Sequence, residues 1–241
     1  MIPKHLSHIF IDADDTLWEN EIYFREAKHK FALLLSSYAQ ENTVMETFDR
    51  WQEENIPVYG YGSKTCLIGF LDTAAEICGS IPQEIYMNLK SITANILNHD
   101  LVIIDGVPET LDALSRKYSL IVATKGEQME QKAKFHKSGL AKYFMNIEVM
   151  ENKDEAHYAD LAAKYSVSPE NLLMVGNSVK SDIAPVVAIG GTAIYVPHDM
   201  VWEHEIMEMP ISERAIEVEN IRKVSDFLIV SIRRKTSVTE G

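Results

Sequence analysis

Short apolar segments alternate with amphipathic helical patterns along much of the chain, and this alternation constrains the fold more than any other feature. Runs typical of buried strands occupy residues 7–11, 119–123, 146–150, 171–175 and 192–196. Helical patterns occupy residues 127–138, 154–165, 181–189 and 224–232. Strands separated by helices are joined by crossover connections, which place them parallel in one sheet with helices on its faces. The sequence therefore predicts an α/β protein with a doubly wound, Rossmann-like parallel sheet.

A long helical stretch interrupts this alternation after the first strand. Between about Trp18 and His99, apolar residues recur at helical spacing, and a segment at 55–64 with one proline and two glycines divides the stretch into two halves. We therefore expect a core domain formed by residues 1–17 and 100–241, and a helical domain inserted at residues 18–99.

Acidic residues crowd the end of the first predicted strand, in the segment "FIDADDTLWENE" at 10–21. Such a turn is common before a helix and has little specificity alone. Ligands of an open parallel sheet, however, bind at the carboxyl ends of its strands. Polar and charged residues follow each of the first four predicted strands, in the order Asp12 and Asp14, Thr124 and Lys125, Lys153, then Asn177 and Asp182.

Four motifs in this order make the chain resemble the haloacid dehalogenase superfamily. They are "DADDT" at 12–16, Thr124, Lys153 and "GNSVKSD" at 176–182. The inserted helical domain resembles the C1-type cap that members carry between the first two motifs. The resemblance implies a phosphatase in which Asp12 attacks phosphorus and forms an aspartyl-phosphate. It also implies that Asp14 acts as general acid and base, and that the substrate is a small phosphorylated metabolite.

The resemblance further implies how the phosphate and its cofactor are bound. Thr124 and Lys153 bind the phosphoryl group, and Lys125 either adds charge there or is a solvated surface lysine. Mg²⁺ is the implied cofactor, held by the Asp12 side chain, the Asp14 carbonyl, Asn177 and Asp182. The physical need is clear, because each charge pair between a carboxylate nucleophile and a phosphate dianion at 4 Å costs about 4 kcal/mol. Cations must offset that repulsion before attack is possible.

One residue of these motifs departs from the family pattern, and another is expected to take no part in the chemistry. Most relatives have aspartate where this chain has Asn177, so we expect a metal site with one negative charge fewer and weaker Mg²⁺ affinity. Asp15 is expected to point away from Asp12 and Asp14 by strand alternation, which favours a structural role.

Three alternatives to the phosphatase remain open. A 2-haloacid dehalogenase would use Asp12 on carbon and needs neither Mg²⁺ nor Asp14, so the presence of Asp14 counts against it. A phosphosugar mutase would use the same residues and protect the aspartyl-phosphate from water. A non-catalytic binding protein is disfavoured because Asp12, Asp14 and Lys153 are all present.

Weaker signals concern substrate specificity and a second metal. Tyr59, Tyr61 and Lys64, at the break in the helical stretch, either contact the leaving group or form a tight interhelical turn, and Trp18 either lines the pocket or the hinge. The segment that holds His198, His204 and Glu205 does not have the spacing of a zinc motif on a helix, and a packed or substrate-side loop is favoured.

Composition excludes several classes of partner. The formal net charge of −13 argues against nucleic acid and against an anionic membrane surface. No apolar window is long enough to span a bilayer, and the two cysteines, Cys66 and Cys78, are too few for a disulfide framework. We expect a cytoplasmic protein with reduced thiols.

Overall fold

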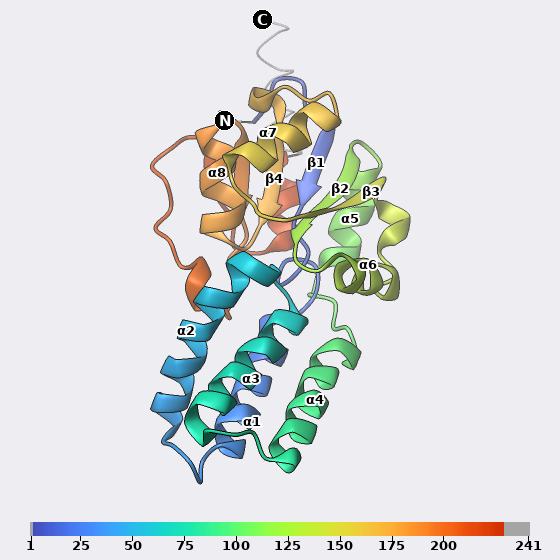
Figure 1. The fold of residues 1–241 in the computed structure, drawn as a ribbon. Coiled ribbons are helices and arrows are strands. Elements are labelled where there is room, and N and C mark those ends of the chain that lie inside the picture. The colour runs from blue at the N-terminus through green and yellow to red at the C-terminus, as the bar shows by residue number, and fades with distance from the viewer. Residues whose placement is uncertain (1, 229–241) are drawn as a thin grey trace, which may run out of the picture. The chain divides into compact units, whose positions relative to one another are not determined.

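The computed structural model describes residues 2–228, and a parallel sheet of six strands forms its core (Figure 1). The strand order is β3-β2-β1-β4-β5-β6, and each neighbouring pair is parallel. β1 lies in the middle, where Phe10 is opposite Ile121 of β2 and Met174 of β4. The strands are β1 (His8–Ile11), β2 (Ser119–Lys125), β3 (Asn146–Met150), β4 (Leu173–Gly176), β5 (Thr192–Tyr195) and β6 (Ala215–Glu217). This arrangement confirms the predicted α/β class and doubly wound sheet.

Apolar side chains alternate between the two faces of the sheet and bury a core on each. Along β1, Ile9 and Ile11 pack into one cluster with α5 (Val107–Ser115) and the helical segment 221–228. Phe10 points to the other face and packs with α7 (Glu155–Lys164) and α8 (Ala184–Ala188). Because both faces are buried, the strands are almost wholly apolar, and polar side chains concentrate at the strand ends.

The inserted helices form a second compact unit with a core of its own. This unit comprises residues 20–100 and 126–131, and the first unit comprises the rest of the described chain. Its helices are α1 (Glu21–Leu34), α2 (Glu41–Tyr59), α3 (Ser63–Cys78) and α4 (Gln83–Asn98). Phe70 packs between Phe31 and Phe48, with ring centroids 4.4 and 4.9 Å apart. The predicted insertion at 18–99 is nearly the same segment, whereas 126–131, which includes the start of α6 (Gln128–Lys137), was assigned to the core domain.

Local elements differ from the sequence expectations at three places. α2 continues through Pro57 to Tyr59, so the break before α3 is only Gly60–Gly62, where Gly60 and Gly62 have φ values of 77° and 126°. β6 was not predicted, because its three residues are too short to show an alternating pattern. The last predicted helix at 224–232 begins earlier, at residue 221, and residues 229–232 of that prediction lie outside the described residues.

Among the helices between residues 2 and 228, none combines the length and the apolar character that a bilayer crossing requires.

Candidate active site

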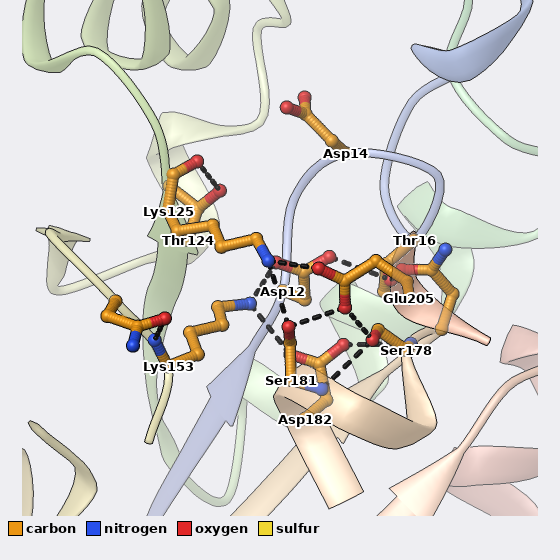
Figure 2. Close-up of polar contacts among 12 residues, drawn as sticks. Asp12, Asp14, Thr16, Thr124, Lys125, Lys153, Ser178, Ser181, Asp182 and Glu205 are labelled. Atoms are coloured by element: carbon orange, nitrogen blue, oxygen red, sulfur yellow. Dashed lines mark hydrogen bonds and ion pairs between the residues drawn. The ribbon is translucent and has the colours of Figure 1, made fainter. Parts of the chain in front are cut away.

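The carboxyl end of the sheet gathers the residues of all four motifs. Asp12 directly follows β1, and its backbone N–H donates to the Val175 carbonyl of β4 at 2.9 Å. Thr124 and Lys125 end β2, and Lys153 lies between β3 and α7. Asn177 follows β4, and Asp182 lies in a π-helical turn at Val179–Ile183. The order of the strands thus brings these side chains to one edge, as expected from the sequence (Figure 2).

Lys153 joins two buried carboxylates at this edge. Its Nζ donates to Asp12 Oδ1 and, at 2.7 Å, to Asp182 Oδ1, and all three side chains are almost fully inaccessible to solvent. Burial raises the pKa of Asp12 above its usual range, and the nearby charge of Asp182 adds to that rise. Burial alone would lower the pKa of Lys153, but the two carboxylates raise it above its usual value. Lys153 is therefore a fixed positive charge beside the proposed nucleophile.

Gly176 makes room for Asp182. A Cβ atom on Gly176 would lie 2.2 Å from Asp182 Oδ2, which is far inside van der Waals contact. The same oxygen accepts a hydrogen bond from the Ser178 backbone N–H at 3.0 Å. Both carboxylate oxygens of Asp182 thus have donors within the protein, and Asp182 holds Lys153 and the turn after β4 together.

Four oxygen atoms converge beside Asp12 in a way that fits a small hard cation. The Asn177 amide oxygen lies 3.1 Å from Thr16 Oγ1 and 3.2 Å from both Asp12 Oδ2 and the Asp14 carbonyl oxygen. Apart from the Thr16 hydroxyl, these neighbours are acceptors. Without a cation among them they are better matched by the amide nitrogen than by the amide oxygen, and a rotation of the amide would place the nitrogen there. Octahedral Mg²⁺ has ligands at 2.0–2.1 Å and hence adjacent oxygens about 2.9 Å apart. The donor set therefore fits Mg²⁺ held by Asp12, Asn177 and the Asp14 carbonyl.

The Asp14 side chain points away from Asp12, although the two were expected to share a face of an extended chain (Figure 2). The chain turns after Asp12, with a hydrogen bond from Leu17 N to the Ala13 carbonyl at 2.8 Å, so strand alternation does not apply there. Asp14 Oδ1 instead accepts from Trp18 Nε1 at 2.7 Å and from Lys134 Nζ at 2.6 Å. Lys134 also donates to Oδ2 at 2.8 Å.

Lys125 is a paired side chain rather than a solvated one. Its Nζ donates to Ser181 Oγ at 2.9 Å and forms an ion pair with Glu205. The sequence offered no signal for Lys134, because a lysine at its place in α6 looks the same as a lysine on the exposed face of a helix. The segment that holds Glu205 is predicted to be a packed or substrate-side loop rather than a zinc motif, and this prediction does not include the contact with Lys125.

Asp15 and Glu19 face His198 at a separate place in the first unit. His198 Nε2 lies 3.2 Å from Glu19 Oε2, and His198 Nδ1 lies 4.0 Å from Asp15 Oδ1. Their possible ligand atoms all lie within 4.8 Å of one another. Asp15 has a φ of 57°, which aspartate tolerates better than most residues. Among the residues between 2 and 228, this is the single such cluster, and it includes neither His204 nor Glu205.

The residues proposed for specificity lie in different settings. Tyr59, the last residue of α2, is 58% exposed, and Lys64, which forms an ion pair with Glu127 at 3.4 Å, is also largely exposed. Tyr61 lies between α2 and α3 and is partly buried. Trp18 is fully buried in the first unit, where its indole Nε1 donates to Asp14 Oδ1.

Comparison with known proteins identifies the family. A model described as haloacid dehalogenase-like hydrolase matches residues 6–190. The chain belongs to this family. A search of curated proteins finds no match.

Solved structures with the same fold include proteins named as dehalogenases and proteins named as phosphatases. A haloacid dehalogenase-like family hydrolase from Xanthomonas campestris is 30% identical, with a TM-score of 0.85 over 93% of this chain and 91% of the other. A 2-haloacid dehalogenase from Pseudomonas syringae pv. tomato is 20% identical, with a TM-score of 0.64 over 93% and 99%. A predicted phosphoglycolate phosphatase from Haemophilus somnus is 18% identical, with a TM-score of 0.62 over 92% and 98%. The last two likenesses establish the fold and not the reaction.

Proposed function

We propose that this hydrolase is a Mg²⁺-dependent phosphatase that acts on a small phosphate monoester. The observation that carries the proposal is the group of oxygens from Asp12, Asn177 and the Asp14 carbonyl beside the Lys153 ammonium. A carboxylate that attacks carbon and releases halide has no dianion to approach. A carboxylate that attacks a phosphate dianion requires positive charge on both sides of its path.

Asp12 is the proposed nucleophile, and its surroundings fit that role. Oδ1 is held by Lys153, while Oδ2 accepts from the Thr16 hydroxyl at 3.3 Å and faces the Asn177 amide. The carboxylate is therefore oriented before the substrate arrives. Mg²⁺ would supply charge neutralisation for the nucleophile and the phosphoryl oxygens. Lys153 supplies the same on the opposite side, and Thr124, buried at the end of β2, is proposed to donate to a phosphoryl oxygen.

Asp14 is the proposed general acid and base, in a role that requires it to change partners. While paired with Lys134 and Trp18, the Asp14 carboxylate is an acceptor and has no proton to donate. It must give up the Lys134 contact and take up a proton from solvent, which it then donates to the leaving-group oxygen. As a carboxylate again, it can accept a proton from the water that hydrolyses the intermediate, and that proton is available for the next turnover. The expected partner is a small phosphate ester, with Tyr59, Tyr61 and Lys64 as candidate contacts to its leaving group.

A phosphosugar mutase remains the second candidate, because Asp12, Asp14, Lys153 and the oxygen group would serve phosphoryl transfer to a sugar as well as to water. A dehalogenase is the third, since one structural neighbour carries that name. The buried lysine and oxygen group at Asp12 favour phosphorus chemistry over it.

The deciding experiment measures both chemistries on one preparation. The purified protein is incubated with a panel of phosphate monoesters, with Mg²⁺ or with EDTA, and separately with 2-chloropropionate. We expect phosphate release that requires Mg²⁺ and no chloride release. Asp12→Asn should abolish phosphate release while leaving the thermal unfolding temperature within a few degrees. Chloride release without phosphate release would replace the phosphatase with a dehalogenase. Transfer between phosphosugars with little free phosphate would indicate a mutase.

A further inference from the structure

Glu205 lies beyond residues 6–190, the part of the chain that the family model matches, and no catalytic motif includes it. It belongs to a short helical turn at Glu203–Glu205, in the connection between β5 and β6. Despite this remote position in the sequence, its side chain reaches the end of the sheet where Asp12 lies (Figure 2). The Glu205 side chain is only 11% exposed.

Three donors hold the Glu205 carboxylate at this edge. Lys125 Nζ pairs with Oε1, and the hydroxyls of Ser178 and Ser181 donate to Oε2. Lys125 also donates to Ser181 Oγ at 2.9 Å, so lysine, serine and glutamate form a closed ring of contacts. Burial alone would raise the pKa of Glu205, but the Lys125 ammonium and the two hydroxyls bring it below its usual value. Glu205 is therefore a buried anion with dedicated partners.

These partners belong to the phosphatase site described above. Lys125 follows Thr124 directly at the end of β2, and Figure 2 shows the side chains of Lys125 and Lys153 directed toward the same region beside Asp12. Ser178 follows Asn177, and its backbone N–H donates to Asp182. Glu205 thus ties the end of β2 to the turn after β4, which are the two segments that flank β1.

We propose that Glu205 is a positioning residue that fixes the Lys125 ammonium for binding the phosphoryl group. Lysine has a long stem with several rotatable bonds, and holding its ammonium in one place has an entropic cost that a partner must offset. Glu205 and Ser181 provide two acceptors on one side of Nζ and so define its position. A charge that is placed in advance stabilises a bound anion better than one that must first be ordered. This inference rests on the proposed phosphatase function.

In the opposite role, Glu205 would be an internal anion that occupies the phosphate position, and the substrate would have to displace it. The two roles predict opposite effects on phosphate binding when the charge of Glu205 is removed. If Glu205 positions Lys125, removing its charge weakens phosphate binding. If Glu205 competes with phosphate, removing its charge strengthens it. The geometry favours positioning, because the Ser178 and Ser181 hydroxyls both donate to Glu205 Oε2 and would lose this acceptor if the carboxylate moved.

The test compares four proteins with the wild type: Glu205→Gln, Lys125→Met, the double variant, and Glu203→Gln. Glu203 is the matched control, because it is exposed, lies two residues away in the same turn and has the same side chain. Each protein is assayed in Mg²⁺ with p-nitrophenyl phosphate for kcat and KM, and with inorganic phosphate as a competitive inhibitor.

For Glu205→Gln we expect the inhibition constant of phosphate and KM to rise about tenfold, the equivalent of one charge-assisted hydrogen bond, while kcat changes much less. Glu203→Gln should match the wild type. Because Glu205 acts through Lys125, the double variant should bind phosphate no more weakly than Lys125→Met alone. Unchanged or tighter phosphate binding in Glu205→Gln overturns the proposal, and so do fully additive losses in the double variant.

A second readout is made on the folded Glu205→Gln protein and does not depend on catalytic activity. The rate at which acetic anhydride modifies Lys125 is measured by peptide mass spectrometry, with Lys164, an exposed lysine, as the internal reference. Loss of Glu205 should raise the Lys125 rate relative to Lys164, and Ser181→Ala should raise it less. An unchanged ratio overturns the proposal. If the wild type hydrolyses no phosphate ester but loss of Glu205 still raises the Lys125 rate relative to Lys164, the phosphatase function is refuted and the Glu205–Lys125 contact is not.

Discussion

Replacing Lys153 by methionine tests whether this lysine holds the site together. In the wild type, Lys153 Nζ contacts the buried carboxylates of Asp12 and Asp182, and its side chain is 2% exposed. Lys153→Met removes the cation and leaves two like charges in a buried place. Breaking a buried pair in this way typically destabilises a protein by about 3–5 kcal/mol. For a chain of this size that corresponds to a fall in Tm of roughly 6–20 °C.

The pH dependence of this loss follows from the sign of each pKa shift. The pKa of Lys153 is raised in the folded state, so its contribution is complete below the unfolded pKa and is the same at pH 5 and pH 8. The pKa of Asp12 is already raised by burial, and removing Lys153 raises it further. A carboxyl group whose folded pKa exceeds its unfolded value disfavours folding once the pH rises above the unfolded value. The deficit of Lys153→Met should therefore be larger at pH 8 than at pH 5.

The assay is urea unfolding with EDTA present, so that no cation replaces the lysine. Lys164→Met is the matched control, because Lys164 pairs with Glu148 at 2.7 Å but is 58% exposed, and such pairs contribute at most about 1 kcal/mol. Adding Asp182→Asn to Lys153→Met should recover part of the loss. If Lys153→Met costs no more than Lys164→Met, or if its deficit does not depend on pH, the assignment of Lys153 as the buried counter-charge is refuted.

Three further predictions concern other parts of the chain. Asn177→Asp should lower the Mg²⁺ concentration for half-maximal activity, because it adds a charged oxygen ligand; an unchanged or higher midpoint in a Mg²⁺ titration would exclude Asn177 as a ligand. Asp14→Asn should reduce kcat/KM for alkyl phosphates at least tenfold more than for p-nitrophenyl phosphate, whose leaving group needs no acid; equal losses would count against the acid role. Burial raises the pKa of the Cys66 thiol to about 12, so iodoacetamide at pH 8 should modify it in urea but not in the folded protein; rapid labelling of native protein would contradict this burial.

The sequence predicted the sheet and the residues at its edge because both depend on local patterns. Apolar runs separated by helical periods define a parallel sheet, and the carboxyl ends of its strands meet by topology. Asp12, Lys153 and Asp182 therefore could be placed together without coordinates. The inserted helical unit was found in the same way, since a long segment with only helical periodicity stands out against the alternation.

The partners of these residues could not be predicted, because they depend on side-chain directions and on turns. The turn after Asp12 directs the Asp14 side chain to Lys134 on α6, whereas an extended chain would have directed it toward Asp12. Glu205 lies in an irregular connection with no periodicity, and its contact with Lys125 spans 80 residues. The sequence around Lys134 and around Glu205 does not distinguish either residue from a charged residue on the surface.

The distribution of charge at the site gives a physical reason for an amide at position 177. Each buried or half-buried carboxylate at this edge already has its own lysine: Asp14 has Lys134, Glu205 has Lys125, and Asp12 shares Lys153 with Asp182. A fifth carboxylate at 177 would stand 3.2 Å from Asp12 Oδ2 with no further lysine in contact among the described residues, and like charges at such a distance repel strongly in a site of low dielectric. An amide keeps an oxygen at this position and can turn its nitrogen to the same neighbours when no cation is bound. We therefore expect Asn177 to destabilise the metal-free site less than an aspartate would, with weaker Mg²⁺ binding as the consequence.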